Sequence, residues 1–455
     1  MKWENKKITT PVADFVKTYT ENNITRLHMP GHKGKSFLGC ELWDITEVNG
    51  ADSLYEADGI IAESEANASK LFGSKCTLFS TEGSSQCIRA MLYLIMLNGR
   101  NRDKNGKRPV IAAARNVHKA FIYAAALLDF DVIWLWPEER VSSICSCIIS
   151  PKKAERVLDE HQEIMAVYLT SPDYLGAQAD IREIADICHN KNVILAVDNA
   201  HGAYLKFLEK SQHPLDLGAD ICCDSAHKTL PVLTGGAYLH ISKNAPEIWK
   251  EQAKQAMGLF GSTSPSYLTL MSLDLCNRYL SQNYMKRLAE IIELRCSCCK
   301  ELELSGWRVR KSDPLKITLE IPYGISNVEL TKHLHHERIE CEYADQNYIV
   351  FMLTPENTKQ DLEQLVSGMG KNQYVYKEKE YLSVSPARQM MSIREAMFSI
   401  SENIALTKAE NRICRMPTIS CPPAIPIAVP GEVITKELIS VFQYYGITKL
   451  DVVKE

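Results

Sequence analysis

The chain has 455 residues, which is too long for one ordinary hydrophobic core, so we expect two domains with additional segments. Hydrophobic residues make up 45% and charged residues 24% of the sequence, as in ordinary globular proteins. The net charge of −4 excludes a strongly basic surface for nucleic acid or anionic lipid. The N-terminal residues lack the apolar core of a signal peptide, and no stretch is apolar enough to span a bilayer. We therefore expect a cytoplasmic protein that binds neither nucleic acid nor membranes.

Short apolar runs alternate with helical patterns between about residues 75 and 240. Most of these runs lack polar alternation, as expected of strands buried on both faces, so the rhythm predicts a mostly parallel α/β sheet flanked by helices. Ligands of such sheets bind beyond the carboxyl ends of the strands, so the residues that follow each run matter most. The predicted strands cover residues 76–79, 110–114, 131–136, 164–170, 193–197, 220–223 and 236–241.

The pattern changes after about residue 285, where helices and strand-like runs predict a smaller C-terminal α+β domain. The resulting division is an N-terminal arm (1–43), a large domain (44–285) and the small domain with its helical tail (286–455). The tail contains the proline-rich segment 420–432, which is too apolar for a free linker and is expected to pack.

The fifteen cysteines are expected to be reduced thiols, because nothing in the sequence indicates secretion. Three of them, Cys296, Cys298 and Cys299, lie close together in a helical pattern. A zinc site requires a second pair of ligands at a suitable distance, and none is evident. We therefore predict structural cysteines and no metal site.

Several residues with chemical potential follow the predicted strands. Ser84 and Ser85 open a helix after the first run, where free N–H groups and hydroxyls suit a phosphate, although serine is also a common helix cap. His118 stands at a later helix start, where a structural role is the simpler interpretation. Asp198 ends an apolar strand, and its carboxylate either caps the next helix or meets a cationic ligand atom.

The segment DSAHK (224–228) follows another buried strand and places a histidine directly before Lys228. A phosphate cradle, an aspartate, a histidine and a lysine at one sheet edge are together what pyridoxal 5′-phosphate requires. Its aldehyde bonds covalently to a lysine amine, and a carboxylate keeps its pyridine nitrogen protonated. Lysine suits this role because burial readily lowers its pKa.

Motifs along nearly the whole chain resemble the short form of the Orn/Lys/Arg decarboxylases, which are fold-type-I enzymes that depend on pyridoxal phosphate. The matching stretches occur in the family's order. They are RLHMPGHKG (26–34), 44–73, RNVHKA (115–120), TSPDYLG (170–176), DNAHG (198–202), DSAHKTLPVLTGGAYLH (224–240), STSPSYL (262–268) and PPAIPIAVPGE (422–432).

The resemblance implies a role for each matching residue. Lys228 would form the Schiff base, Asp198 would pair with the pyridine nitrogen, and His118 and Ala200 would contact opposite faces of the ring. His201 would lie near the substrate. The phosphate would be held by Ser84, Ser85, Ser225 and His227. Family members share active sites across a homodimer, in which Thr263 would reach the partner's phosphate.

Two positions depart from the family pattern. Glu82 introduces a charge beside the expected phosphate loop, where it either points away or weakens phosphate binding. Ala424 replaces the glycine that is usual in PPGIP.

The expected reaction is α-decarboxylation of arginine, lysine or ornithine to the amine and carbon dioxide, serving polyamine biosynthesis rather than acid resistance. Glu432 and Asp345 are candidates for binding the distal cation of the substrate, and the alternative for each is a solvated surface charge. The competing functions are an aminotransferase or aldolase on the same scaffold, and a non-catalytic paralogue. An aminotransferase would bind the α-carboxylate through an arginine of the small domain. Arg308, Arg310 and Arg338 are available, but the motifs single out none of them. The intact Lys228 and Asp198 argue against the paralogue.

Overall fold

The computed structural model describes residues 8–100, 108–138, 141–377, 382, 386–418 and 423–455. The chain divides into two compact units, one formed by residues 1–98 and 195–288 and the other by residues 99–194 and 289–455. The division of the chain into an arm, a large domain and a small domain stays a prediction.

The first unit contains most of the residues singled out from the sequence. Its strands are β1 (Cys76–Ser80), β5 (Ile194–Asp198), β6 (Ile221–Asp224) and β7 (Ala237–Ile241). Its helices are α1 (Pro11–Glu21), α2 (Ile60–Phe72), α3 (Gly83–Arg100), α7 (Ala226–Thr229), α8 (Glu247–Gly258) and α9 (Tyr267–Leu280), with the short 3-10 turns η1 (Ala203–Phe207) and η2 (Pro214–Leu217).

The second unit begins with β2 (Val110–Ala114), α4 (Lys119–Leu128), β3 (Asp131–Leu135), α5 (Pro151–Glu160), β4 (Ile164–Thr170) and α6 (Ile181–Asn190). After α10 (Tyr284–Leu304), it continues with β8 (Arg308–Arg310), β9 (Lys316–Glu320), α11 (Asn327–His336), β10 (Tyr343–Ala344), β11 (Tyr348–Met352) and α12 (Lys359–Met369). The tail contains α13 (Ile393–Phe398), β12 (Ser401–Ala405), η3 (Leu406–Lys408), α14 (Lys436–Tyr444) and β13 (Lys449–Val453).

Seven strands form one sheet in the order β1-β7-β6-β5-β4-β2-β3. The β5–β6, β4–β2 and β2–β3 pairs are parallel, whereas β7 runs antiparallel to both β1 and β6. The prediction of a mostly parallel α/β sheet is therefore confirmed. All seven predicted strands are present with small differences at their ends, because uninterrupted apolar runs are buried on both faces of such a sheet.

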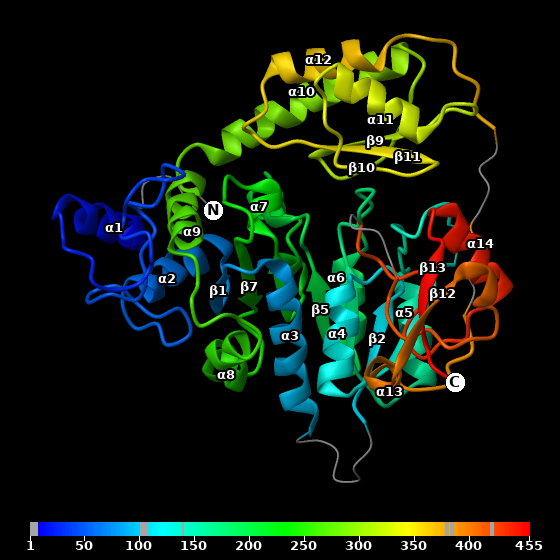
Figure 1. The fold of residues 1–455 in the computed structure, drawn as a ribbon, viewed down its shortest axis with the longest axis horizontal. Coiled ribbons are helices and arrows are strands. Elements are labelled where there is room, and N and C mark those ends of the chain that lie inside the picture. Colours follow the sequence, from blue (N-terminus) through cyan, green and yellow to red (C-terminus); the bar gives the residue numbers. More distant parts are fainter. Residues whose placement is uncertain (1–7, 101–107, 139–140, 378–381, 383–385, 419–422) are drawn as a thin grey trace. The chain divides into compact units, whose positions relative to one another are not determined.

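A second sheet, with the order β10-β11-β9-β8, is fully antiparallel and carries helices α10, α11 and α12 on one face (Figure 1). This is the small α+β arrangement predicted after residue 285. The tail adds the antiparallel β12–β13 pair and its own core, which includes Ile427, Phe442 and Val452. Residues 423–432 are buried, so this part of the proline-rich segment packs as expected, while residues 420–422 lie outside the described residues.

Candidate active site

The amine of Lys228 is held beside an imidazole at the carboxyl end of two neighbouring parallel strands. Lys228 lies on α7, directly after β6, and its Nζ is 3.0 Å from Nε2 of His201, which follows β5. His201 is buried and Lys228 is partly buried. A lysine placed this way can exchange a proton with the imidazole, and it is close enough to a buried region for its nucleophilicity to be controlled.

A buried carboxylate stands at the end of β5. Asp198 is the last residue of that strand and is only 2% exposed. Its Oδ1 accepts a hydrogen bond from the backbone N–H of Ala200 at 3.2 Å and a weak one from Cys223 Sγ at 3.7 Å. A buried carboxylate is stabilised by a cationic group beside it, so this position suits a protonated ligand nitrogen.

Two hydroxyls meet between α3 and the end of β6. Ser225 Oγ donates to Ser84 Oγ at 2.8 Å, which brings together two of the residues predicted to bind phosphate. Both Ser84 and Ser85 lie in the first turn of α3, whose 18 residues begin at Gly83 as the sequence predicted. The N–H groups of a first helical turn and adjacent hydroxyls are typical phosphate ligands.

His227 is fixed by two contacts with one carbonyl group. Its backbone N–H donates to the oxygen of Gly236 at 3.1 Å, and its Nδ1 lies 2.9 Å from the same oxygen. Since a carbonyl only accepts hydrogen bonds, Nδ1 carries the proton of this contact. These two contacts set the orientation of the imidazole ring.

Glu82 is bound to the loop that contains Thr263. Its Oε1 accepts a hydrogen bond from the backbone N–H of Ser262. Thr263 is exposed in this loop, and Glu82 is also exposed. The carboxylate that departs from the family pattern thus connects two segments predicted to be near phosphate groups.

His118 belongs to the second unit. It is the N-cap of α4, as its position at a predicted helix start indicated, and its Nδ1 accepts from the backbone N–H of Ala120 at 3.2 Å. The next residue, Lys119, donates its backbone N–H to the carbonyl of Ala424 at 2.9 Å. Ala424 has a φ of 58°, a conformation that glycine adopts at lower cost, which explains why glycine suits this position.

The two candidates for the distal cation are both buried, so the alternative of a solvated surface charge is wrong for each. Glu432 is 2% exposed and lies 3.5 Å from Nη2 of Arg115. Burial raises the pKa of Glu432, while Arg115 and the N–H of Val429 lower it.

Asp345 is 4% exposed and accepts hydrogen bonds from Ser143 Oγ at 2.9 Å and Tyr343 OH at 3.0 Å. Burial raises its pKa, while hydrogen bonds from backbone and side-chain donors lower it. Both carboxylates therefore have protein partners of their own.

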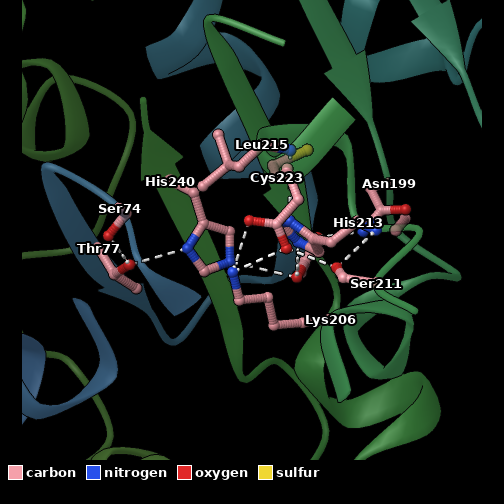
Figure 2. Close-up of polar contacts among 12 residues, drawn as sticks. Ser74, Thr77, Asn199, Lys206, Ser211, His213, Leu215, Cys223 and His240 are labelled. Carbon is pink, nitrogen blue, oxygen red and sulfur yellow. Dashed lines mark hydrogen bonds and ion pairs between the residues drawn. The ribbon is translucent and has the colours of Figure 1, made fainter. Parts of the chain in front are cut away.

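A cluster around Asp224 escaped sequence reasoning. Its carboxylate is completely buried. It forms a group with His213 and His240, both labelled in Figure 2, and the ligand atoms of the three residues all lie within 4.8 Å of one another. The available signal was a charged residue inside the apolar run ICCD, near two histidines that the apolar pattern did not require.

The fold and this strand-end arrangement define a class, the fold-type-I architecture. The lysine decarboxylase LdcF of Francisella novicida has a similar structure, with a TM-score of 0.80 and 17% sequence identity over 98% of this chain and 81% of that one. Lysine decarboxylase A of Pseudomonas aeruginosa gives a TM-score of 0.79 and 16% identity over 98% of this chain and 80% of that one.

Sequence comparison identifies the family. The profile of the Orn/Lys/Arg decarboxylase major domain matches residues 10–320, and that of the C-terminal domain matches residues 372–450. Arginine decarboxylase of Bacillus subtilis is 28% identical over 95% of this chain and 92% of its own. Arginine decarboxylase of Halalkalibacterium halodurans is 26% identical over 94% of this chain and 91% of its own. The chain belongs to the Orn/Lys/Arg decarboxylase family and is an amino-acid decarboxylase.

Proposed function

We propose that this enzyme uses pyridoxal 5′-phosphate to remove the α-carboxylate of a basic amino acid as carbon dioxide. The observation that carries the proposal is the 3.0 Å contact between Lys228 Nζ and His201 Nε2, together with the buried carboxylate of Asp198 at the end of β5. When bound, the cofactor supplies an electron sink for the pair of electrons left by the departing carboxylate.

The donor set of the first unit fits this cofactor. Lys228 provides the amine for covalent attachment, and Asp198 provides a buried anion for a protonated pyridine nitrogen. The paired hydroxyls of Ser84 and Ser225 provide phosphate ligands at a helix start. Ser85 and His227 complete the proposed phosphate site, and Ala200 is the proposed contact of one ring face. For the other ring face, the family resemblance proposes His118, which belongs to the second unit.

His201 is the proposed proton-handling partner of Lys228. Its Nε2 is within hydrogen-bonding distance of the amine, so a proton can pass between the two groups during substrate binding and product release. Lys228 or His201 then delivers the proton that replaces the lost carboxylate. A buried imidazole also excludes water from the amine, which favours loss of the charged carboxylate as a neutral gas.

Arginine is the substrate that we rank first, followed by lysine and ornithine. Two relatives that align over more than nine tenths of their length are named arginine decarboxylases. Lysine decarboxylases of Pseudomonas aeruginosa and Escherichia coli match over shorter parts of this chain, 50% and 62%. The binding of the distal cation by Glu432 or Asp345 stays a prediction, since each carboxylate already has protein partners.

A homodimer with shared active sites is part of the proposal. Thr263 is exposed in a loop next to the phosphate site, as a residue that reaches a partner subunit must be. The arm also exposes large apolar side chains, among them Leu27, Phe37 and Leu38 at 80–91% exposure. Apolar surface of this kind is typical of protein interfaces.

We further propose a cytoplasmic enzyme that serves polyamine biosynthesis. Cys87, Cys222 and Cys223 are free, buried thiols, as expected in a reducing compartment. In the described part of the chain, no helix is long and apolar enough to cross a membrane.

The experiment that tests the cofactor assignment locates the covalent bond. The purified protein is incubated with pyridoxal phosphate, reduced with borohydride and digested, and the modified peptide is identified by mass spectrometry. The proposal expects modification at Lys228. Stoichiometric modification at another lysine, with Lys228 unmodified, would contradict it.

A further inference from the structure

The carboxylate of Asp224 is the centre of a buried hydrogen-bond network that includes His213, His240 and Asn199, all three labelled in Figure 2. Its Oδ2 lies 3.1 Å from His213 Nε2 and 3.2 Å from His240 Nε2, and its Oδ1 accepts from Asn199 Nδ2 at 2.7 Å. All four residues are fully buried. A carboxylate in such a position requires several donors to offset its loss of hydration, and here it has three.

The strand register brings this network together. His240 on β7 is directly opposite Thr77 on β1 and Cys222 on β6, so Asp224, two residues after Cys222, lies on the same face. Thr77 Oγ1 lies 2.8 Å from His240 Nδ1, and Ser74 extends the chain of contacts at 2.8 Å from Thr77.

Hydrogen bonding assigns the protons of both rings. His213 Nδ1 accepts from the backbone N–H of Leu215 at 3.4 Å, so its ring proton is on Nε2, facing Asp224. Burial lowers the pKa of His240 despite the opposing effect of Asp224, which favours a neutral ring whose Nε2–H also faces the carboxylate. Burial raises the pKa of Asp224, but the two histidines outweigh it and hold that pKa well below its usual range. The network is thus an anionic carboxylate with two imidazole donors.

The same three residues could ligate a metal ion, but the contacts favour a hydrogen-bonded cluster. Metal binding through Nε2 would require both rings to lose the protons that face Asp224. A further cation would also be repelled by Lys206, whose positive charge lowers the pKa of His240. Lys206, labelled in Figure 2, pairs with Asp216 at 2.7 Å.

Asn199 connects this network to the active site. Its backbone N–H donates to the carbonyl of Cys223 at 2.9 Å, and its side chain donates to Asp224, so it joins the end of β5 to the end of β6 twice. Asp198 precedes Asn199, and Ser225 follows Asp224. The segments joined in this way also contain His201 and Lys228. A side-chain methyl at Gly202 would lie 2.0 Å from Asn199 Oδ1, so the glycine leaves room for this amide.

We propose that Asp224 is a positioning residue for decarboxylation: through Asn199 it fixes the distance between Asp198 and Lys228 across the β5–β6 seam. This inference rests on the proposed function, because the two groups would hold opposite ends of one cofactor. Precise spacing matters there, since small displacements of reacting groups are costly in rate.

The first test compares Asp224→Asn with Asp220→Asn in the full-length protein loaded with pyridoxal phosphate. Asp220 is a matched control, because its carboxylate accepts the N–H of Leu195 at 2.8 Å at the opposite end of the same strand pair. The measurements are kcat, KM and the pH midpoint of the visible absorbance of the bound cofactor. We expect Asp224→Asn to lower kcat roughly 10- to 100-fold, with KM changed less than about threefold and the absorbance midpoint shifted. Asp220→Asn should leave all three near wild-type values.

A second variant keeps the inference testable if Asp224→Asn does not fold. Asn199→Ala removes the other partner of the hydrogen bond between Asn199 and Asp224. It should give the same fall in kcat and the same spectral shift. If both single variants fold, the double variant should be no worse than the worse single variant, because both remove one interaction. Wild-type kcat and absorbance in Asn199→Ala would overturn the inference. So would a stoichiometric metal ion in the purified protein that Asp224→Asn loses.

Failure of the proposed function would be seen in the wild-type protein, which would then bind no pyridoxal phosphate and release no carbon dioxide. If only this inference fails, the wild type will be active, and Asp224→Asn and Asn199→Ala will be equally active.

Discussion

Lys228 Nζ lies 3.0 Å from His201 Nε2, and the two residues come from different strand ends of the same unit. This contact predicts that His201 controls the protonation of the lysine. His201→Phe, which keeps a flat ring but has no nitrogen, should lower kcat by roughly 100-fold, because a positioned acid–base group typically contributes 10²–10⁴-fold. His201→Gln provides a side chain that forms hydrogen bonds but does not titrate. It should therefore have a KM near the wild-type value, but not the wild-type pH profile of kcat. An unchanged kcat–pH profile in His201→Phe would exclude His201 from proton transfer.

Asp198→Asn tests the buried carboxylate at the end of β5. The amide keeps the shape and can still accept from the N–H of Ala200, but it cannot offset a cationic ligand nitrogen. We expect kcat to fall by roughly two to four orders of magnitude while the cofactor still binds. Steady-state kinetics and cofactor absorbance measure the two effects separately. Near-normal turnover would remove Asp198 from the proposed mechanism.

Much of the fold can be predicted from the sequence, because a strand that is buried on both faces appears as an uninterrupted apolar run. Runs such as VIAAA and IMAVYLT have no polar interruption and became β2 and β4 with the predicted bounds. The antiparallel pairing of β12 with β13 was not predicted. The strand Ser401–Ala405 is only partly buried, and its partner is more than 40 residues away in sequence, so neither periodicity nor proximity indicates the pairing.

Some residues of the candidate site could likewise be predicted from local sequence, and others could not. Strand ends could be located from sequence: Asp198 is the last residue of β5, and Lys228 lies on α7 directly after β6. The network of Asp224 could not be predicted, because His240 reaches it only through the diagonal register of β6 and β7. The burial of Asp345 and Glu432 depends likewise on long-range contacts, which local sequence does not specify.

Glu82→Gln tests the departure in the phosphate loop. The amide oxygen can still accept from the N–H of Ser262, so the loop should keep its structure while the negative charge is lost. Because Glu82 is exposed and directed to Ser262, we expect the Kd of pyridoxal phosphate to change less than about threefold. Fluorescence titration measures this affinity. The control is Glu63→Gln, an exposed substitution on α2, which should leave this Kd unchanged. A tenfold tighter Kd in Glu82→Gln alone would show that Glu82 repels the phosphate.

Asp173 predicts a pH-dependent stability. Burial raises its pKa to about 6, whereas the unfolded value is about 3.9. The folded protein therefore binds the carboxyl proton of Asp173 more tightly than the unfolded chain does. As a result, Asp173 favours folding increasingly as the pH falls through 6, and its ionised form opposes folding above that pH. Asp173→Asn removes the ionised form and should stabilise the protein by about 1–3 kcal/mol at pH 8 and by little near pH 4.

Thermal unfolding at both pH values measures this difference. The side-chain oxygen of asparagine can still accept from the N–H of Ala177, as the Oδ1 of Asp173 does at 2.9 Å. Asp186→Asn, an exposed substitution on α6, is the matched control and should have no effect at either pH. The same change in melting temperature for Asp173→Asn at pH 4 and pH 8 would show that its ionisation is not responsible.

The most direct test of the central claim is carbon dioxide release by the purified protein with pyridoxal phosphate, given arginine, lysine and ornithine separately. The proposed function predicts release from one of them, with the corresponding amine formed in equal amount, and arginine ranked first. Lys228→Ala should release none, because the amine that holds the cofactor is missing. No release from any of the three by a wild-type protein that binds the cofactor would contradict the proposed substrate class. Undiminished release by Lys228→Ala would contradict the role of Lys228 itself.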